Sequence, residues 1–286
     1  MTHVRVIAGF ALRESVRRKV FVVVAVLTTA FLALYGLGTW QAYEAVDEFG
    51  SGPGLAGVEP EVVAGATLLG LAMFATLFLA TILAVFLTLG VVRGDAERGL
   101  LQPVLVRPVR RRTLLLARFA AAGTVSAAYV VAVFLAAAVI TWAIGGWWPD
   151  RVAGPAAQLA LAVTILTALS LAGSVLLAST ANGIAVFMLF GAGLTAGLLG
   201  QIGEALRSET LGTVAQVASW ALPFEALYQS ALSAITADTV GFTRLALDLG
   251  PFGGAQDAGP ALWAWAVAYV ALVGALATAA FVRRDL

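Results

Sequence analysis

An all-α membrane protein of six transmembrane helices, forming a single domain over residues 1–286, is the fold that the sequence predicts. Hydrophobic residues make up 61% of the chain and charged residues only 12%, whereas soluble domains are about 45–50% apolar and about 25% charged. The apolar residues gather into six runs that are long enough to cross a hydrocarbon core of about 30 Å. Basic residues separate these runs mainly on one side of the predicted membrane.

The N-terminal residues 3–19 are predicted to form a basic amphipathic helix in the membrane surface. Ile7 and Ala11 recur at helical spacing among five basic residues; a frayed basic terminus is the alternative. The first span follows at about 20–38, and because it is a full-length apolar run, no cleaved signal peptide is expected. An acidic outer loop is predicted over 41–61.

Five further spans are predicted from the remaining apolar runs, at about 62–92, 113–144, 156–178, 184–202 and 261–282. The turn signal Asn182-Gly183 separates the fourth span from the fifth. The long segment 203–260, between the fifth and sixth spans, is predicted to lie outside the cytoplasm.

The distribution of charge predicts that both termini lie in the cytoplasm. Among the 17 Lys and Arg residues, all except Arg151, Arg207 and Arg244 fall on the proposed inner side, as the positive-inside rule expects. The seven Trp residues fall at or beyond predicted outer ends, where amphipathic rings are favoured. Heavy use of Arg over Lys suggests a GC-rich bacterial genome, so we expect the protein in the bacterial cytoplasmic (inner) membrane.

Several classes of chemistry are excluded by what the sequence lacks. It has one His, His3, and no Cys, so it offers no catalytic triad and no metal site. Its one Lys, Lys19, is not preceded by Gly, so no ATP-binding loop and no cofactor are expected in this chain. No ionisable residue lies near the middle of a predicted span, which argues against an ion-coupled carrier or an intramembrane protease. The class of protein that these observations leave is a transporter that takes its energy from another protein.

The segment 93–118 carries the most specific pattern in the chain and seven of its arginines. On charge alone it is a solvated basic loop. Its residue order resembles the signature of the permease subunits of type-2 ATP-binding-cassette (ABC) exporters, in which Glu-x-Gly-Thr-Leu-Glu is followed by an apolar stretch and Pro-Val-Ser-Arg. The residues that match are Glu97, Gly99, Leu101, Arg107, Pro108, Val109, Arg111 and Leu114 to Leu116. The residues that depart are Leu100, Gln102, Pro103, Arg110, Ala117 and Arg118.

This resemblance implies a cytoplasmic coupling helix between the second and third spans, which docks a separate ABC ATPase subunit. ATP and Mg²⁺ would be bound by that partner, and a second permease subunit, identical or homologous, would complete the pathway. The residues expected to couple to the ATPase are Glu97, Arg98, Gly99, Arg107, Pro108 and Arg111. Because Pro103 removes a backbone donor, the length of the coupling helix stays open.

The second and fifth spans line the translocation pathway in the related permeases, so their residues are candidates here. In the second span the candidates recur every seven residues on one stripe, at Thr67, Phe74, Thr81 and Thr88. In the fifth span they are Phe187, Phe190 and Leu194. The alternative is that Thr and small residues only pack the spans together.

An outer gate is predicted after the fifth span, within residues 205–237. Following Pro223, residues including Phe224, Leu227 and Tyr228 recur at helical spacing and form one apolar face. The polar residues that fall largely on the other side are Glu225, Gln229, Ser230 and Ser233. Related permeases have re-entrant helices at this place, so we expect a re-entrant or a surface-lying helix and hypothesise that it closes the pathway. A helix that only anchors the sixth span is the alternative.

These features predict the permease subunit of an ATP-driven ABC exporter, which is not itself an enzyme and works as a dimer in the lipid bilayer. A non-transporting membrane anchor or assembly factor with the same fold is the alternative. No nucleic-acid partner is expected. No motif in the chain identifies the transported substrate or tells a homodimer from a heterodimer.

Overall fold

The computed structural model describes residues 19–50, 58–88, 111–243 and 259–283, in which every long element is a helix. The helices are α2 (Lys19–Gly50), α3 (Pro60–Thr88), α6 (Arg111–Gly145), α7 (Ala153–Leu176), α8 (Ser179–Ala205), α9 (Glu209–Ala221), α10 (Pro223–Ala234) and α12 (Pro260–Val282). Residues 3–18 of the helix predicted over 3–19 and the coupling residues from 93 to 110 lie outside the described residues, and Lys19 is the first residue of α2.

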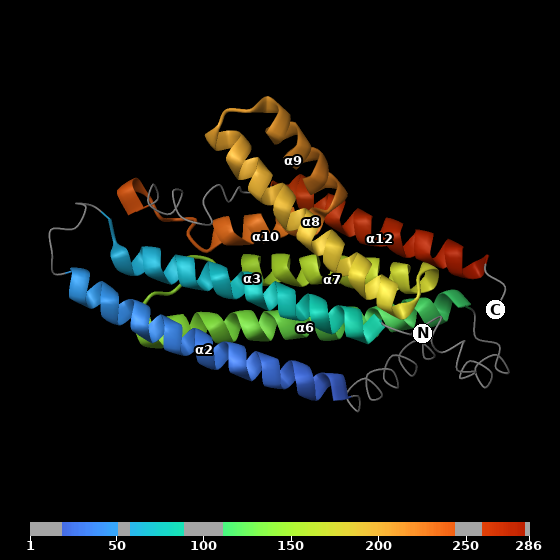
Figure 1. Cartoon of the computed structure of the whole chain (residues 1–286), viewed down its shortest axis with the longest axis horizontal. Helices are drawn as coiled ribbons and strands as arrows, with labels where there is room; N and C mark the ends of the chain where they lie inside the picture. The colour runs from blue at the N-terminus through green and yellow to red at the C-terminus, as the bar shows by residue number, and fades with distance from the viewer. Residues whose placement is uncertain (1–18, 51–57, 89–110, 244–258, 284–286) are drawn as a thin grey trace.

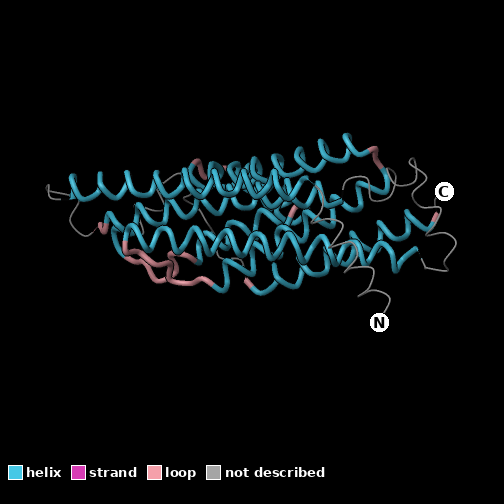
Figure 2. The backbone as a smooth tube through the Cα atoms, turned by 90° about the horizontal axis from the view of Figure 1, so that it is seen from below, coloured by secondary structure: helices cyan, strands magenta, loops and turns pink. Residues whose placement is uncertain are grey.

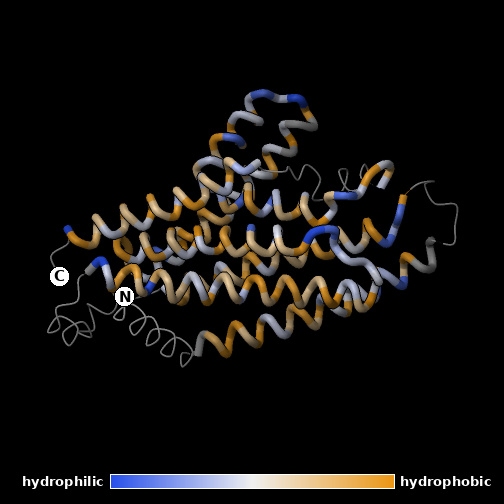
Figure 3. The backbone as a smooth tube through the Cα atoms, turned by 180° about the vertical axis from the view of Figure 1, so that it is seen from behind, coloured by the Kyte–Doolittle hydropathy of each residue, from blue (hydrophilic) through white to orange (hydrophobic). Residues whose placement is uncertain are grey.

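Six of the described helices, α2, α3, α6, α7, α8 and α12, are long and apolar enough to cross a membrane. The shortest apolar span, in α8, has 22 residues, which at a rise of about 1.5 Å per residue covers the hydrocarbon core of about 30 Å. Figure 3 shows apolar residues along these helices and hydrophilic residues gathered toward their ends and at the α8–α9 turn. The predicted all-α fold with six spans is confirmed.

α3 and α7 form the centre of the bundle, while α2, α8 and α12 expose most of their apolar surface. Figures 1 and 2 show the long helices side by side along one axis, and Figure 1 shows α8 rising away from the bundle until α9 folds back beside it. The start of α2, the end of α3, the start of α6 and the end of α12 lie at the same end of the bundle (Figure 1). We call this the coupling end, because the segment 93–110 joins α3 to α6 there.

The first helix continues well beyond the predicted end at residue 38. α2 runs to Gly50, through the first part of the predicted acidic loop over 41–61. The buried Tyr43 packs within this extension: its ring occupies space left by Gly145, its hydroxyl lies at Gly65, and that hydroxyl donates a hydrogen bond to the Glu61 carbonyl over 3.2 Å. The length of the apolar run does not reveal these contacts with Gly65 of α3 and Gly145 of α6.

The boundary between the fourth and fifth spans lies before the predicted turn. α7 ends at Leu176 and α8 begins at Ser179, so Asn182 and Gly183 belong to the first turns of α8. The Asn182 side chain is buried, and its Nδ2 donates to the Ser170 carbonyl of α7 over 2.9 Å. Asn182 and Gly183 therefore do not form the turn between the two helices, and Asn182 instead packs α8 against α7.

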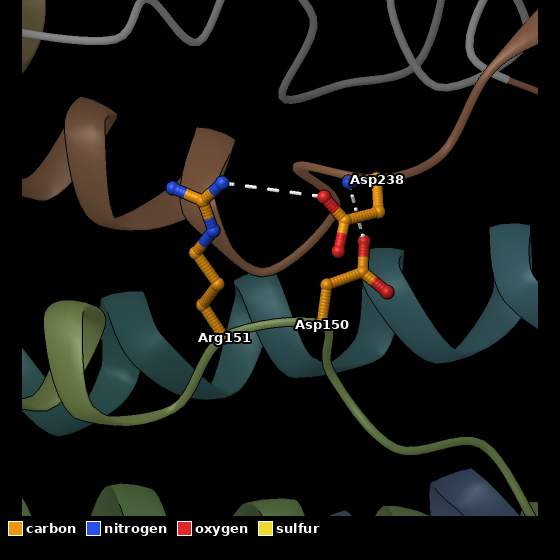
Figure 4. A network of polar contacts seen from close by, with 3 residues as sticks. All are labelled: Asp150, Arg151 and Asp238. Atoms are coloured by element: carbon orange, nitrogen blue, oxygen red, sulfur yellow. Dashed lines mark hydrogen bonds and ion pairs between the residues drawn. The ribbon is translucent and has the colours of Figure 1, made fainter.

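The loop between α6 and α7 is tied to the chain that follows α10 (Figure 4). The backbone N–H of Asp150 donates to the Ile235 carbonyl over 3.1 Å, and the backbone N–H of Asp238 donates to Asp150 Oδ2 over 2.9 Å. Arg151 and Asp238 form an exposed ion pair at 4.0 Å, a type worth at most about 1 kcal/mol. The two backbone hydrogen bonds therefore hold the end of α10 at the end of the bundle opposite the coupling end.

Replacing Gly145 with Ala tests the contact that extends α2. A Cβ at Gly145 would overlap the Tyr43 ring, and forced overpacking of this kind costs about 1–3 kcal/mol. We expect a lower melting temperature of the purified protein in detergent. Gly123→Ala is the matched control in the same helix, because a Cβ there meets no atom within 4 Å. A Gly145→Ala protein as stable as Gly123→Ala would contradict this packing.

Candidate functional site: the aromatic cluster between α3, α8 and α10

Six aromatic side chains from three helices meet near the middle of the bundle, and we call them the aromatic cluster. They are Phe74 and Phe78 of α3, Phe187 and Phe190 of α8, and Phe224 and Tyr228 of α10. Phe190 is the hub, because its ring centroid lies 5.8 Å from Phe224, 5.9 Å from Phe78 and 6.4 Å from Phe74. The Phe190 and Phe224 rings are stacked with an interplanar angle of 10°. Such pairs contribute about 0.5–1.5 kcal/mol each beyond area burial.

The cluster brings together residues predicted separately as pathway lining and as outer gate. Phe74, Phe187 and Phe190 come from the first set, and Phe224 and Tyr228 from the second. Of the remaining gate and pathway candidates, Leu227 is fully buried and Leu194 is partly buried against the same core. The roles assigned to these residues stay predictions, but their mutual contact is a property of the fold.

Phe78 belongs to the cluster although the sequence analysis did not single it out. It lies one helical turn after Phe74, and its ring contacts Phe187 at 6.0 Å. Residues four apart share a helix face, so the spacing from Phe74 was a usable signal. Phe78 is 40% exposed while Phe224 is fully buried, so the cluster extends from the surface of the protein into its core.

The four residues predicted to form one stripe along α3 are not all equally buried. Thr67 and Phe74 are half-buried, whereas Thr81 and Thr88 are completely buried. A repeat of seven residues drifts by about 20° per repeat on a straight helix, so the stripe turns from the edge of the exposed face into the protein. Thr81 and Thr88 pack helices in this structure, in line with the alternative stated for them.

Thr88 is part of a buried polar chain at the coupling end of the bundle. Its Oγ1 lies 2.6 Å from Ser170 Oγ, and the Ser170 carbonyl accepts the hydrogen bond from Asn182 Nδ2. A Cβ at Gly173 would overlap Asn182 Oδ1, so this glycine permits the close approach of α7 and α8. We call Thr88, Ser170 and Asn182 the polar chain. It links the last residue of α3 to α7 and to the start of α8.

α10 is buried on more sides than its sequence pattern indicates. Glu225, Ser230 and Ser233, expected on an exposed polar face, are buried together with the apolar residues. The reason is that α10 packs against α7, α8, α9 and α12 together, and Gln158 Nε2 of α7 donates to Ser230 Oγ over 2.7 Å. α9, by contrast, has no buried residue among those described. α10 is thus an internal helix, and α9 is a surface helix.

Two glycines of α8 receive the side chains of α10. A Cβ at Gly193 would lie 2.5 Å from the Phe224 ring, and a Cβ at Gly197 would overlap Oε1 of Glu225. We call Gly193 and Gly197 the glycine notches. Their spacing, Gly-x-x-x-Gly, is a recognised signal for close helix approach in membranes, and it could have predicted this contact.

Glu225 is a carboxyl group held inside the protein, only 4% exposed. Its Oε1 accepts a hydrogen bond of 2.9 Å from Gln229 Nε2. Burial raises the pKa of this carboxyl to about 7, and the Gln229 hydrogen bond lowers it only in part. The helical pattern places Glu225 opposite the apolar face, and the glycine notch that receives it is the signal that the pattern does not contain.

The other predicted site residues lie outside this region. The coupling candidates from Glu97 to Pro108 are outside the described residues, and Arg111 begins α6 at the coupling end. Within the described ranges, no group of three His, Cys, Asp or Glu side chains is placed to hold a metal ion.

Comparison with known families gives one match over nearly the whole chain. A family model described as "ABC-2 family transporter protein" matches residues 5–286. A comparison with curated proteins gave no match.

The raised pKa of Glu225 predicts a specific dependence of stability on pH. Between its ordinary value of 4.5 and about 7, the folded protein keeps a proton that the unfolded chain has released. The stabilising contribution is therefore complete below pH 4.5 and is lost as the pH rises through 7, by up to about 3 kcal/mol. We expect wild type to lose more thermal stability than Glu225→Gln between pH 5 and pH 8.

The matched control for this prediction is Glu209→Gln. Glu209 is exposed on α9, so this variant should follow the wild-type pH profile. Parallel pH profiles for wild type and Glu225→Gln would show that the Glu225 carboxyl titrates alike in the folded and unfolded states.

Proposed function

Because the chain belongs to the ABC-2 family of transporter proteins, we propose that it is the permease subunit of an ATP-driven exporter in the bacterial cytoplasmic membrane. Membership of the family makes it a multi-pass membrane permease of an ABC transporter and not a catalyst. The finer proposal adds the direction of transport, a dimer of permeases, and a separate ATPase subunit that binds ATP and Mg²⁺.

The observation that carries this proposal is the aromatic cluster. It joins α3 and α8, the second and fifth spans, to α10, the helix that connects onward to the last span. A pathway gate needs side chains from several helices that can separate and close again. The stacked Phe190 and Phe224 rings supply such a contact, which the glycine notches allow to close tightly.

The polar chain supports the coupling part of the proposal. α3 ends at Thr88, directly before the segment proposed to dock the ATPase, and Thr88 is hydrogen-bonded to Ser170. Asn182 extends the link to α8, whose phenylalanines belong to the cluster. Hydrogen bonds buried in a low dielectric hold packed elements together, so a rigid-body movement of the coupling segment would reach α8.

The exposed apolar faces of α3 and α8 support the dimer. Phe78 of α3 and Ile184 and Met188 of α8 are exposed, and the Phe78 ring contacts Phe187. In our proposal this shared face meets the second permease subunit, identical or homologous, so that the two aromatic clusters flank one pathway.

Reversing the charge of Glu97 tests the predicted contact between the permease and its ATPase subunit. Glu97→Arg should release an ATPase subunit that co-purifies with the wild-type permease from native membranes. Leaving a desolvated charge without its partner costs about 2–5 kcal/mol, enough to weaken assembly about 30-fold or more. Co-purification measures assembly, and ATP turnover in reconstituted vesicles measures coupling.

Glu209→Arg is the matched control, because it reverses an exposed acid on α9, on the predicted outer side. It should leave assembly and ATP turnover unchanged. Normal assembly and normal transport by Glu97→Arg would argue against this docking contact. The absence of any ATPase partner from wild-type preparations would favour the membrane-anchor alternative.

A further inference from the structure

Glu225 is a buried acid without a buried base. Gln229 is its hydrogen-bond donor, and no Lys or Arg side chain among the described residues forms an ion pair with it. The Gln229 Oε1 atom is itself buried and accepts no hydrogen bond within the described part of the chain. A carboxylate removed from water is strongly unfavourable unless a cation or a proton compensates it. Within the described part of the chain, the site therefore has acceptor atoms and no cationic partner.

The aromatic cluster leads from the protein surface to this carboxyl group. Phe78 is exposed and Phe187 is half-buried, and both rings are close to each other on the outer face of α3 and α8. Phe190 and the fully buried Phe224 continue the path inward. Glu225 follows Phe224 directly in α10 and meets the next glycine notch of α8. The ring contacts thus run from an exposed ring to the buried turn of α10 that carries the carboxyl group.

This combination is selective for one class of ligand. The faces of aromatic rings attract cations through the ring quadrupole, and desolvated cation–π contacts contribute about 2 kcal/mol. A carboxylate adds charge attraction and repels anions, while the apolar rings disfavour a small hydrated cation such as Na⁺. The chemistry fits a cation whose charge is surrounded by apolar groups.

We propose that the aromatic cluster and Glu225 form the cargo site of the permease and that its cargo is a lipophilic organic cation, such as a tertiary or quaternary ammonium compound. This inference rests on the proposed transport function. Phe190, Phe224 and the Glu225 carboxyl group lie at the interface between α8 and α10, where Phe224 and Glu225 fill the glycine notches. Separation of α8 from α10 exposes ring faces and carboxylate to the same space, and their return expels the cargo.

A pair of probes with the same shape and opposite charge tests the site. Tetraphenylphosphonium and tetraphenylborate are offered to the full-length purified permease in lipid nanodiscs at pH 8, and binding is measured by equilibrium dialysis. We expect saturable binding of tetraphenylphosphonium and only non-saturable lipid partitioning of tetraphenylborate. Glu225→Gln, which keeps the shape of the side chain, should weaken phosphonium binding about tenfold or more.

Two further variants separate binding chemistry from folding. Phe78→Leu retains an apolar side chain at an exposed position and removes a ring face, so it should weaken binding several-fold while the melting temperature stays near wild type. Glu209→Gln, on the exposed surface of α9, should bind as wild type does. If Glu225→Gln binds the phosphonium as tightly as wild type, the proposal is overturned, and the carboxyl group is a protonated structural residue.

Equal saturable binding of the two probes would also overturn it, because selection by charge is the central requirement. Vesicles that contain the permease and its co-purified ATPase then separate this inference from the proposed function. ATP-driven transport of some other solute, with no cation binding, would overturn the cargo class and leave the exporter intact. Cation binding that depends on Glu225, in a protein with no ATPase partner, would support the binding site and contradict the exporter.

Discussion

The contact between α10 and the glycine notches of α8 is the constraint on which the rest of this structure depends. Phe224 and Glu225 fill spaces that any side chain at Gly193 or Gly197 would occupy. The close approach stacks Phe224 on Phe190 and thereby completes the aromatic cluster. It also removes Glu225 from water, and this burial raises the pKa of the carboxyl group to about 7. The completed aromatic cluster and the buried acid are thus two consequences of one helix crossing.

The position of α10 follows from the polar groups that it must satisfy. Inside the bundle its Ser230 is paired with Gln158 of α7, and the Tyr228 hydroxyl donates to the Gly70 carbonyl of α3 over 3.4 Å. At its end the backbone of Asp150 and Asp238 ties the helix to the α6–α7 loop. α10 is held to α7 along its length and touches α8 mainly at the two notches. The cluster would open if α8 moved relative to α10, because α8 meets α10 through the Phe190–Phe224 stack and the glycine notches.

The sequence predicted the spans well because the length of an apolar run is a direct measure of whether it can cross a bilayer. The sequence predicted less well which side of each helix is buried in the protein. The seven-residue stripe on α3 mixes half-buried Phe74 with fully buried Thr88, because seven residues do not complete two turns of a straight helix. The burial of Glu225 was missed because a helical pattern identifies one apolar face, whereas α10 is packed on several sides. Tyr43 extends α2 through contacts with glycines distant in sequence, which no local pattern contains.

The central claim is that α8 and α10 separate and close during transport, and a distance between them tests it most directly. The chain has no Cys, so paired spin labels can be placed on the exposed residues Leu198 of α8 and Asp238 beyond α10. The distance between the labels would be measured by pulsed electron paramagnetic resonance, in nucleotide-free and vanadate-trapped complexes in nanodiscs. The account predicts two different distance distributions, and the change should disappear when the ATPase subunit is catalytically inactive. One unchanged distribution in both states of a transport-competent complex would contradict it.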